Sequence, residues 1–126
     1  MSSRIANICF DAHDPYAQML WWSQVLDDFV VPEEPQSPED EECGLRGPVG
    51  QWMLWLKVPE GKTVKNRMHP CLRPPDRDRD AEIERVLGLG ATLVGDHRQG
   101  PDRGWVVLAD PEGNEFCILR QLTAEE

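Results

Sequence analysis

One stretch of the sequence decides the fold: residues Gly104–Arg120, which run GWVVLADPEGNEFCILR. They predict two β-strands, Trp105–Ala109 and Glu115–Arg120, because β-branched and aromatic residues favour half-buried strands. The segment between them, Asp110–Asn114, combines Asp-Pro with Gly-Asn, and these are residues of tight turns. We therefore expect a β-hairpin here.

Alternation along this hairpin separates two faces. One face is apolar and is expected to lie under a helix: Val106, Leu108, Phe116 and Ile118. The opposite face mixes polar, thiol and aromatic side chains: Trp105, Val107, Glu115 and Cys117. We expect a functional site on this mixed face.

The composition indicates one ordinary acidic domain. The chain has 126 residues and a formal net charge of −10, whereas a nucleic-acid partner requires a basic surface. No apolar run reaches the roughly 18–20 residues that span a bilayer, and the first residues do not resemble a signal peptide. The four cysteines lack the spacing of a disulfide framework. We therefore expect a cytoplasmic protein that binds neither nucleic acid nor membrane.

Two helices and six further strands are expected outside the hairpin. Pro15–Leu26 is expected to be helical because Asp14 can cap it and Pro15 suits its first position. Asp76 is expected to cap a second helix, Arg77–Leu87. The inward stripe of the first helix is expected to be Met19, Trp22, Val25 and Leu26. That of the second is expected to be Ala81, Val86 and Leu87, with Ile83 or Glu84 flanking them. Strands are expected at Arg4–Asp11, Phe29–Pro32, Glu42–Gly47, Gln51–Val58, Arg67–Arg73 and Ala91–Gly95.

The segment Pro32–Glu42, PEEPQSPEDEE, contains three prolines and six acidic residues. Such a composition cannot bury much surface, so it predicts a solvated, mobile loop.

The two halves of the chain repeat one order of elements. Asn7 and Asp14 are separated by the same number of residues as His69 and Asp76. A repeat of this kind means that each half has a face it cannot bury alone. We therefore expect an α+β fold in a single domain, residues 1–126. Two βαβββ modules, about 4–59 and 66–120, would form one curved, cup-like mixed sheet with helices outside.

Four motifs resemble the glyoxalase-like branch of the vicinal oxygen chelate (glyoxalase/bleomycin resistance/dioxygenase) superfamily: FDAHDP, KTVKNRMH, LGLGATLV and GWVVLADPEGNEFCILR. The resemblance extends from Ile5 to Leu119 and implies the same cupped fold. In metal-dependent members of that superfamily, ligands lie at the start of strands one and five and at the end of strands four and eight. The matching positions here are Asn7, His69, Lys57 and Cys117.

Only His69 among these four is a standard metal ligand. A lysine ammonium has no lone pair, and hard cations need several oxygen ligands. We therefore expect neither the usual metal nor another cofactor. A softer alternative stays open, in which four residues form a Cys3His zinc site: Cys9, Cys71, Cys117 and His69. The competing interpretation is that these cysteines are small, packed hydrophobic residues.

The cup is expected to be lined by the faces that the helices leave uncovered: Asn7, Cys9, Asp11, Met53, Trp55, Lys57, Arg67, His69, Cys71, Trp105, Val107, Glu115 and Cys117. Lys57 and Arg67 would make a cationic spot there, unless Arg67 pairs with Glu115 across the strands. Trp55 and Trp105 would supply apolar walls, or serve instead as core or interface residues.

This lining predicts a glyoxalase-like protein of unassigned activity that binds a small anionic or carbonyl-bearing organic ligand, with Asn7 and Cys117 among its contacts. Two alternatives stay open, and with them the question of whether the protein is an enzyme. One is a metal-independent lyase or isomerase in which His69 and Glu115 act as an acid–base pair. The other is a resistance-type protein that sequesters an aromatic compound between Trp55 and Trp105.

Five tryptophans in a chain this short also predict a twofold-symmetric homodimer, because exposed aromatic patches mark interfaces. Trp21 or Trp52 is expected at or near the contact.

Overall fold

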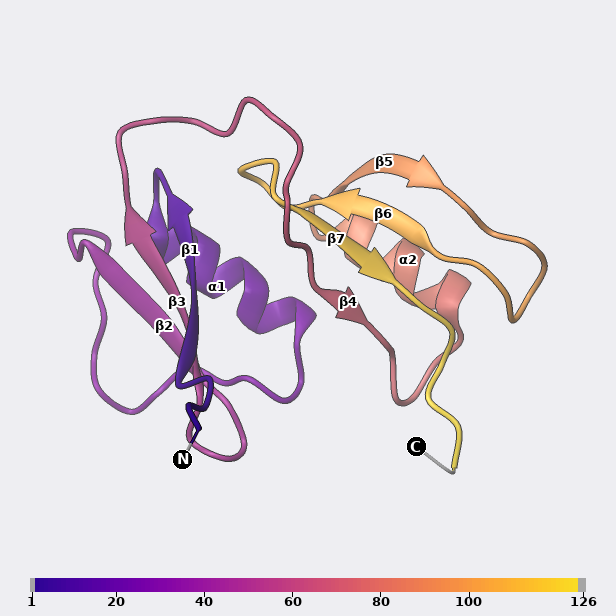
Figure 1. The fold of residues 1–126 in the computed structure, drawn as a ribbon, viewed down its shortest axis with the longest axis horizontal. Helices are drawn as coiled ribbons and strands as arrows, with labels where there is room; N and C mark the ends of the chain where they lie inside the picture. The colour runs from indigo at the N-terminus through magenta and orange to yellow at the C-terminus, as the bar shows by residue number, and fades with distance from the viewer. Residues whose placement is uncertain (1, 125–126) are drawn as a thin grey trace. The chain divides into compact units, whose positions relative to one another are not determined.

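The computed structural model describes residues 2–124 of the chain (Figure 1). The chain divides into two compact units, Met1–Gly61 and Lys62–Glu126, which we call unit 1 and unit 2. Each unit combines one helix with one small sheet among the described residues, so the fold is mixed α+β, as the sequence predicts. In the same part of the chain, no helix is long and apolar enough to cross a membrane.

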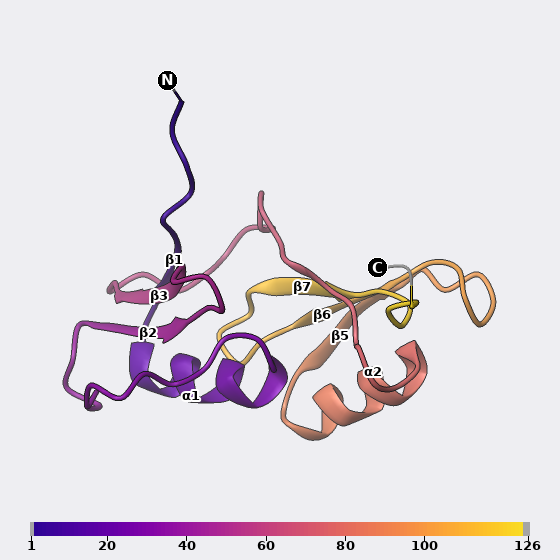
Figure 2. The same ribbon diagram turned by 90° about the horizontal axis from the view of Figure 1, so that it is seen from below.

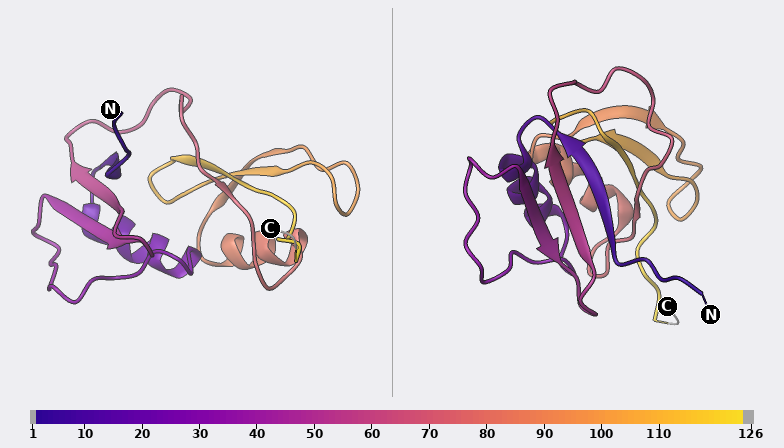
Figure 3. Two further views of the ribbon diagram at one scale, coloured as in Figure 1. Left: turned by 60° about the horizontal axis from the view of Figure 1, so that its bottom comes forward. Right: turned by 60° about the vertical axis from the view of Figure 1, so that its left-hand side comes forward.

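Unit 1 contains β1 (Asn7–Ala12), α1 (Pro15–Val25), β2 (Glu42–Arg46) and β3 (Trp52–Lys57). The strand order is β1-β3-β2, with β1 parallel and β2 antiparallel to β3. The right-hand view of Figure 3 shows these strands side by side with α1 along one face. The helix begins as predicted, because a side-chain oxygen of Asp14 accepts a hydrogen bond from the amide of Ala17 at 3.1 Å.

The buried side of α1 carries the predicted Met19, Trp22 and Val25, together with Gln18 and Trp21. Trp21 and Trp22 contact each other edge to face, with ring centroids 5.2 Å apart. Burying each of the larger apolar side chains stabilises the fold by roughly 1.5–3 kcal/mol. The packing of α1 on its sheet therefore contributes substantially to the stability of unit 1.

The register of β3 on β1 decides which side chains lie under α1. Asn7 is the partner of Trp52, and Phe10 is the partner of Trp55. Partnered residues project from the same face of a sheet. Trp55 is 1% exposed and stacks on Phe10 with ring centroids 5.6 Å apart, so it belongs to the core beneath the helix.

The prediction that Met53, Trp55 and Lys57 share a face with Asn7 is therefore wrong. A change of one residue in register exchanges the two faces of a strand. Trp52 and Leu54 project from the face of Asn7 instead.

The predicted second strand, Phe29–Pro32, is also wrong, because it contracts to a single bridge between Val30 and Arg46. Their backbone amides donate to each other's carbonyls at 2.9 and 2.8 Å. Pro32 has no amide hydrogen and cannot extend the ladder.

The acidic loop beyond Pro32 makes specific contacts with β2. The side-chain amide of Gln36 accepts from the backbone amide of Gly44 at 2.6 Å and donates to the carbonyl of Gly44 at 3.1 Å. Ser37 and Asp40 close a turn through two further hydrogen bonds. The loop thus has more anchoring contacts than its composition predicts, while its mobility stays a prediction.

Unit 2 contains β4 (Cys71–Leu72), α2 (Arg79–Gly88), β5 (Thr92–Asp96), β6 (Val106–Ala109) and β7 (Glu115–Ile118). The strand order is β4-β7-β6-β5, with β4 parallel to β7 and the other pairs antiparallel. Figure 2 shows α2 along one face of this sheet.

The hairpin of β6 and β7 confirms the two predicted faces. Its predicted apolar side chains are all fully buried: Val106, Leu108, Phe116 and Ile118. The turn forms because the carboxylate of Asp110 accepts from the amides of Glu112 and Asn114, each at 3.0 Å. Gly113 adopts a φ of 88°, a left-handed conformation that glycine tolerates best.

Two elements of unit 2 differ from the sequence prediction. The strand expected at Arg67–Arg73 pairs only at Cys71–Leu72, and Met68 is 77% exposed in the segment before it. The second helix begins at Arg79, because Asp78 and not Asp76 accepts from the amide of Ala81 at 2.7 Å.

The later start of α2 rotates its buried face. Ile83 and Val86 pack inward as expected, whereas Ala81 is exposed. Arg79 is buried as well, and its guanidinium donates to the carbonyls of Gly100 and Arg103.

Candidate functional site

Three side chains with metal-binding or nucleophilic chemistry meet at the β4 edge of the sheet in unit 2: His69, Cys71 and Cys117. Cys71 and Cys117 are partners in the parallel pairing of β4 with β7. The donor atoms of all three residues lie within 4.8 Å of one another. Nδ1 of His69 is 3.8 Å from Sγ of Cys117. The structure thus brings together three of the four residues in the predicted soft-metal alternative.

The fourth residue of that alternative, Cys9, lies in β1 of unit 1. Its thiol is 3.5 Å from the side-chain oxygen of Asn7, to which it donates. Cys9 is exposed, as are His69 and Cys71, while Cys117 is buried. Burial, together with the neighbouring Cys71, raises the pKa of the Cys117 thiol to about 11. A thiol of that kind is protonated at neutral pH and is a weak nucleophile.

Glu115, the first residue of β7, forms an ion pair with Lys65. The two groups are 2.5 Å apart, and the side chain of Glu115 is 10% exposed whereas that of Lys65 is 70% exposed. The hydrogen bond from Lys65 holds the pKa of Glu115 below its usual value, and the charges of Lys65, Lys62 and His69 act in the same direction. Glu115 is therefore an ionised and weakly basic carboxylate at neutral pH.

Asn66 holds the segment before β4 against the β6–β7 turn. Its side-chain oxygen accepts from the backbone amide of Glu115 at 2.9 Å, and its side-chain nitrogen donates to the side-chain oxygen of Asn114 at 3.2 Å. Sequence reasoning missed this role. The contacts span almost fifty residues of sequence, and no local pattern signals them.

The remaining site residues predicted in unit 2 are Arg67 and Trp105. Arg67 is exposed in the segment between Asn66 and His69, and the structure pairs Glu115 with Lys65 in its place. Trp105 is 42% exposed and contacts His97, with ring centroids 5.0 Å apart.

The residues predicted in unit 1 are not brought together. Asn7 is the first residue of β1, whereas Lys57 is the last residue of the parallel strand β3 and pairs with Ala12 at the far end of β1. Trp55 lies in the core. The prediction that Trp55 is an apolar wall of the ligand site is wrong, because a side chain 1% exposed under α1 offers no surface to a ligand.

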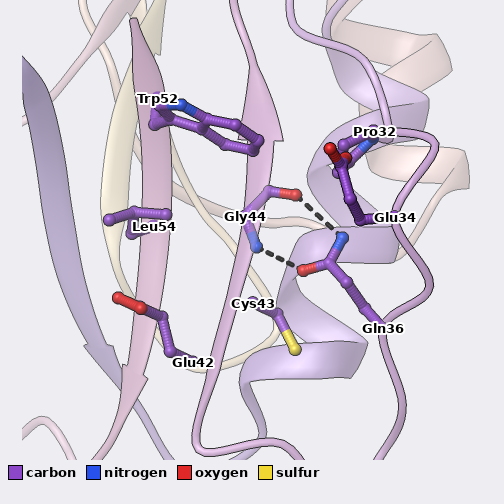
Figure 4. Close-up of a pocket in the computed structure, with 8 residues that line it drawn as sticks. All are labelled: Pro32, Glu34, Gln36, Glu42, Cys43, Gly44, Trp52 and Leu54. Atoms are coloured by element: carbon purple, nitrogen blue, oxygen red, sulfur yellow. Dashed lines mark hydrogen bonds between the residues drawn. The ribbon is translucent and has the colours of Figure 1, made fainter.

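Unit 1 also contains a pocket that the sequence did not predict, with a volume of about 330 Å³. Figure 4 shows Trp52 and Leu54 on one side of it, and Pro32, Glu34 and Gln36 on the other. Gly44 lies between them, where a Cβ atom would come within 2.6 Å of the side chain of Leu54. Burial raises the pKa of the lining thiol of Cys43, so this cysteine stays protonated as well.

Comparison with known proteins places this geometry in a family. The model of the glyoxalase-like domain matches residues 7–119, which is most of the chain. The chain belongs to the glyoxalase-like domain family. No curated protein matches it.

Solved structures similar to this glyoxalase-like protein include a glyoxalase/bleomycin resistance/dioxygenase family enzyme from Burkholderia phytofirmans PsJN. That enzyme is 19% identical with a TM-score of 0.68, over 96% of this chain and 100% of the other. A variant of the fosfomycin resistance protein FosX from Listeria monocytogenes, complexed with Mn(II) and 1S,2S-dihydroxypropylphosphonic acid, is 17% identical with a TM-score of 0.70. The match covers 99% of this chain and 94% of that one.

The oxidase ChaP-H2 is 19% identical with a TM-score of 0.63, over 98% of this chain and 96% of its own. At these identities the likeness establishes the fold alone. The names of these structures also show that activities vary within the fold.

The residues present do not fit a hard metal ion of the kind bound by metal-dependent members. The donors gathered at the β4 edge are two sulfurs and one imidazole nitrogen. The carboxylate nearest in sequence to Cys117 is that of Glu115, and its charge is already neutralised by Lys65. Mn²⁺ and Mg²⁺ prefer carboxylate, carbonyl and water oxygens, so no reaction step through such an ion follows for this chain.

Proposed function

We propose that this glyoxalase-like protein binds a small anionic or carbonyl-bearing organic compound on unit 2, without oxygen-ligated metal chemistry. The observation that carries the proposal is the run of exposed basic groups between residues 62 and 69: Lys62, Lys65, Arg67 and His69. Among the described residues, the acid that forms an ion pair with this run is Glu115, and Lys65 already neutralises it.

The charge of this run is unusual for the protein that carries it. The chain as a whole has a formal net charge of −10, so a compact basic segment is a local exception. A guanidinium and an ammonium recognise carboxylate, phosphonate and carbonyl oxygens through charge-assisted hydrogen bonds. Arg67 is the residue best suited to this role, because its planar fork binds two oxygens at once.

The ion pair of Glu115 weakens the acid–base alternative. A carboxylate whose pKa is lowered by a lysine is a poor general base at neutral pH. His69 remains a candidate for proton transfer to a bound carbonyl compound. We therefore propose ligand binding as the primary function, with any catalysis depending on His69 more than on Glu115.

Titration of the purified protein with methylphosphonate and with pyruvate, followed by calorimetry and amide NMR, tests the proposal. Arg67→Gln is expected to weaken binding about 10-fold, which corresponds to one charge-assisted hydrogen bond. Arg103→Gln is the matched control, because Arg103 is an exposed arginine near the opposite end of β6 from Glu115. Equal affinity in the two variants, or no saturable binding of either probe, would refute the proposal.

We also propose that the protein acts in the cytoplasm as a homodimer. The four cysteines are free thiols, which suits a reducing compartment. Trp21 is buried and is not available for the contact, whereas Trp52 is half-buried and Trp105 is exposed. Light scattering should give twice the chain mass of 14.4 kDa, and a value that stays at 14.4 kDa on concentration would exclude the dimer.

A further inference from the structure

Cys71 and Cys117, which the proposed anion binding does not use, cluster at the β4 edge with His69, a residue of the basic run. Two neighbouring strands hold the two cysteines, because Cys71 and Cys117 are opposite each other in the β4–β7 pairing. The backbone fixes this pairing on both sides of the thiols. The amide of Cys117 donates to the carbonyl of Pro70 at 2.9 Å, and that of Leu119 donates to the carbonyl of Leu72 at 2.8 Å.

His69 completes the cluster from the segment just before β4. Residues two apart in an extended chain project to the same side, which places His69 and Cys71 together. The result is three donor atoms within 4.8 Å of one another, one of them on a buried side chain and two on exposed ones. An ion can therefore enter from solvent and still be held against the sheet.

The spacing of the donors is close to that of a tetrahedral site. Zinc binds sulfur at about 2.3 Å and imidazole nitrogen at about 2.0–2.1 Å, so its ligand atoms lie roughly 3.5–3.8 Å apart. Nδ1 of His69 and Sγ of Cys117 are already 3.8 Å apart. The widest separation in the cluster needs to close by only about 1 Å, which a rotation of an exposed side chain can supply.

We propose that His69, Cys71 and Cys117 bind one thiophilic metal ion of the zinc(II) class. The donor set selects soft and borderline cations over Mg²⁺ or Mn²⁺. Each thiol that binds the ion releases its proton to solvent, and the sulfur lone pair forms the bond to the metal. Three protein ligands leave a fourth position of the tetrahedron for water or a small molecule.

This inference shares His69 with the anion-binding proposal, but the test of that proposal depends on Arg67, which is not a ligand of the zinc cluster. The two fail separately. Loss of phosphonate binding in Arg67→Gln does not bear on zinc affinity, and absence of zinc binding leaves the basic segment as it is.

The test is a zinc titration of the fully reduced protein in competition with a chromophoric chelator, repeated with cadmium to record the sulfur-to-metal charge-transfer band. The expected result is one ion per chain with a charge-transfer band. Cys71→Ala and His69→Gln change exposed side chains, and each is expected to weaken zinc more than ~100-fold, since losing even an outer partner costs 10–100-fold.

The matched control is Cys9→Ala, which removes another exposed thiol, from unit 1. This variant is expected to bind zinc within about twofold of the parent protein. A circular dichroism spectrum of each variant shows that the fold is retained. Equal loss in Cys9→Ala and Cys71→Ala, undiminished binding in Cys71→Ala, or cadmium bound without a sulfur-to-metal charge-transfer band would overturn the proposal.

Discussion

Replacing Asn66 with alanine should loosen unit 2 at the start of β7. The change removes the acceptor for the backbone amide of Glu115 and the donor to Asn114. A typical hydrogen bond contributes about 0.5–1.5 kcal/mol, and leaving a part-buried amide unsatisfied costs about 1–3 kcal/mol. We expect a total loss of about 2 kcal/mol in the free energy of unfolding.

Two measurements report this loss of stability. The urea midpoint is expected to fall by roughly 1 M, since the urea dependence for small proteins is about 1–3 kcal/mol per molar. Hydrogen exchange at the Glu115 amide is expected to accelerate roughly 30-fold, because 1.4 kcal/mol corresponds to a factor of ten. The second readout reports on the bond itself.

The matched control is Asn7→Ala, because Asn7 is exposed and the partner of its side chain is the weak thiol donor of Cys9. It should change stability by less than about 0.5 kcal/mol. If both asparagine variants shift the urea midpoint equally, or if the Glu115 amide keeps its protection without Asn66, the reasoning about this contact is wrong.

Two further predictions concern the ion pair and the core. Because the folded-state pKa of Glu115 is lowered, the Lys65–Glu115 pair adds stability above the unfolded carboxyl pKa of about 4.3, and that stability disappears as pH falls through the folded value. Lys65→Met should return the pKa of Glu115 toward its usual value in an NMR titration. The free energy of unfolding should change by less than about 1 kcal/mol, because Lys65 is exposed. An unchanged pKa of Glu115 would contradict the pairing. Trp55→Ala should lower the free energy of unfolding by about 3–5 kcal/mol in chemical denaturation, whereas the control Trp105→Ala should lower it far less. Similar losses of free energy in the two variants would show that Trp55 is not a core residue.

The hairpin was predictable from sequence because its two rows of residues differ in chemistry. Val106, Leu108, Phe116 and Ile118 form a purely apolar row, so only one assignment of faces buries them. In β3 the two rows are alike: Trp52 and Leu54 are as apolar as Met53 and Trp55. Alternation therefore does not predict which row is buried, and the register of β3 with β1 decides it.

Other misses have equally specific causes. Asp76 and Asp78 are both good N-cap residues, and the local sequence does not distinguish which aspartate starts α2. Of the predicted site, sequence placed His69 and Cys117 on compatible faces, and the structure brings them together with Cys71. The roles of Lys65 and Asn66 could not be predicted from the sequence, because their partners are 48–50 residues away and are brought near only by the folded turn.

The contact between Gln36 and Gly44 has a consequence for solubility. β2 is the outer strand of its sheet, and an outer strand with open amides and carbonyls is a template onto which another chain can add. A glutamine side chain carries the same donor and acceptor as a peptide group, so at Gly44 it occupies the place of one residue of a further strand. The acidic residues on either side of Gln36 repel other copies of this acidic chain. An acidic, proline-rich loop thus closes the β2 edge of the sheet, which would otherwise be open to intermolecular growth.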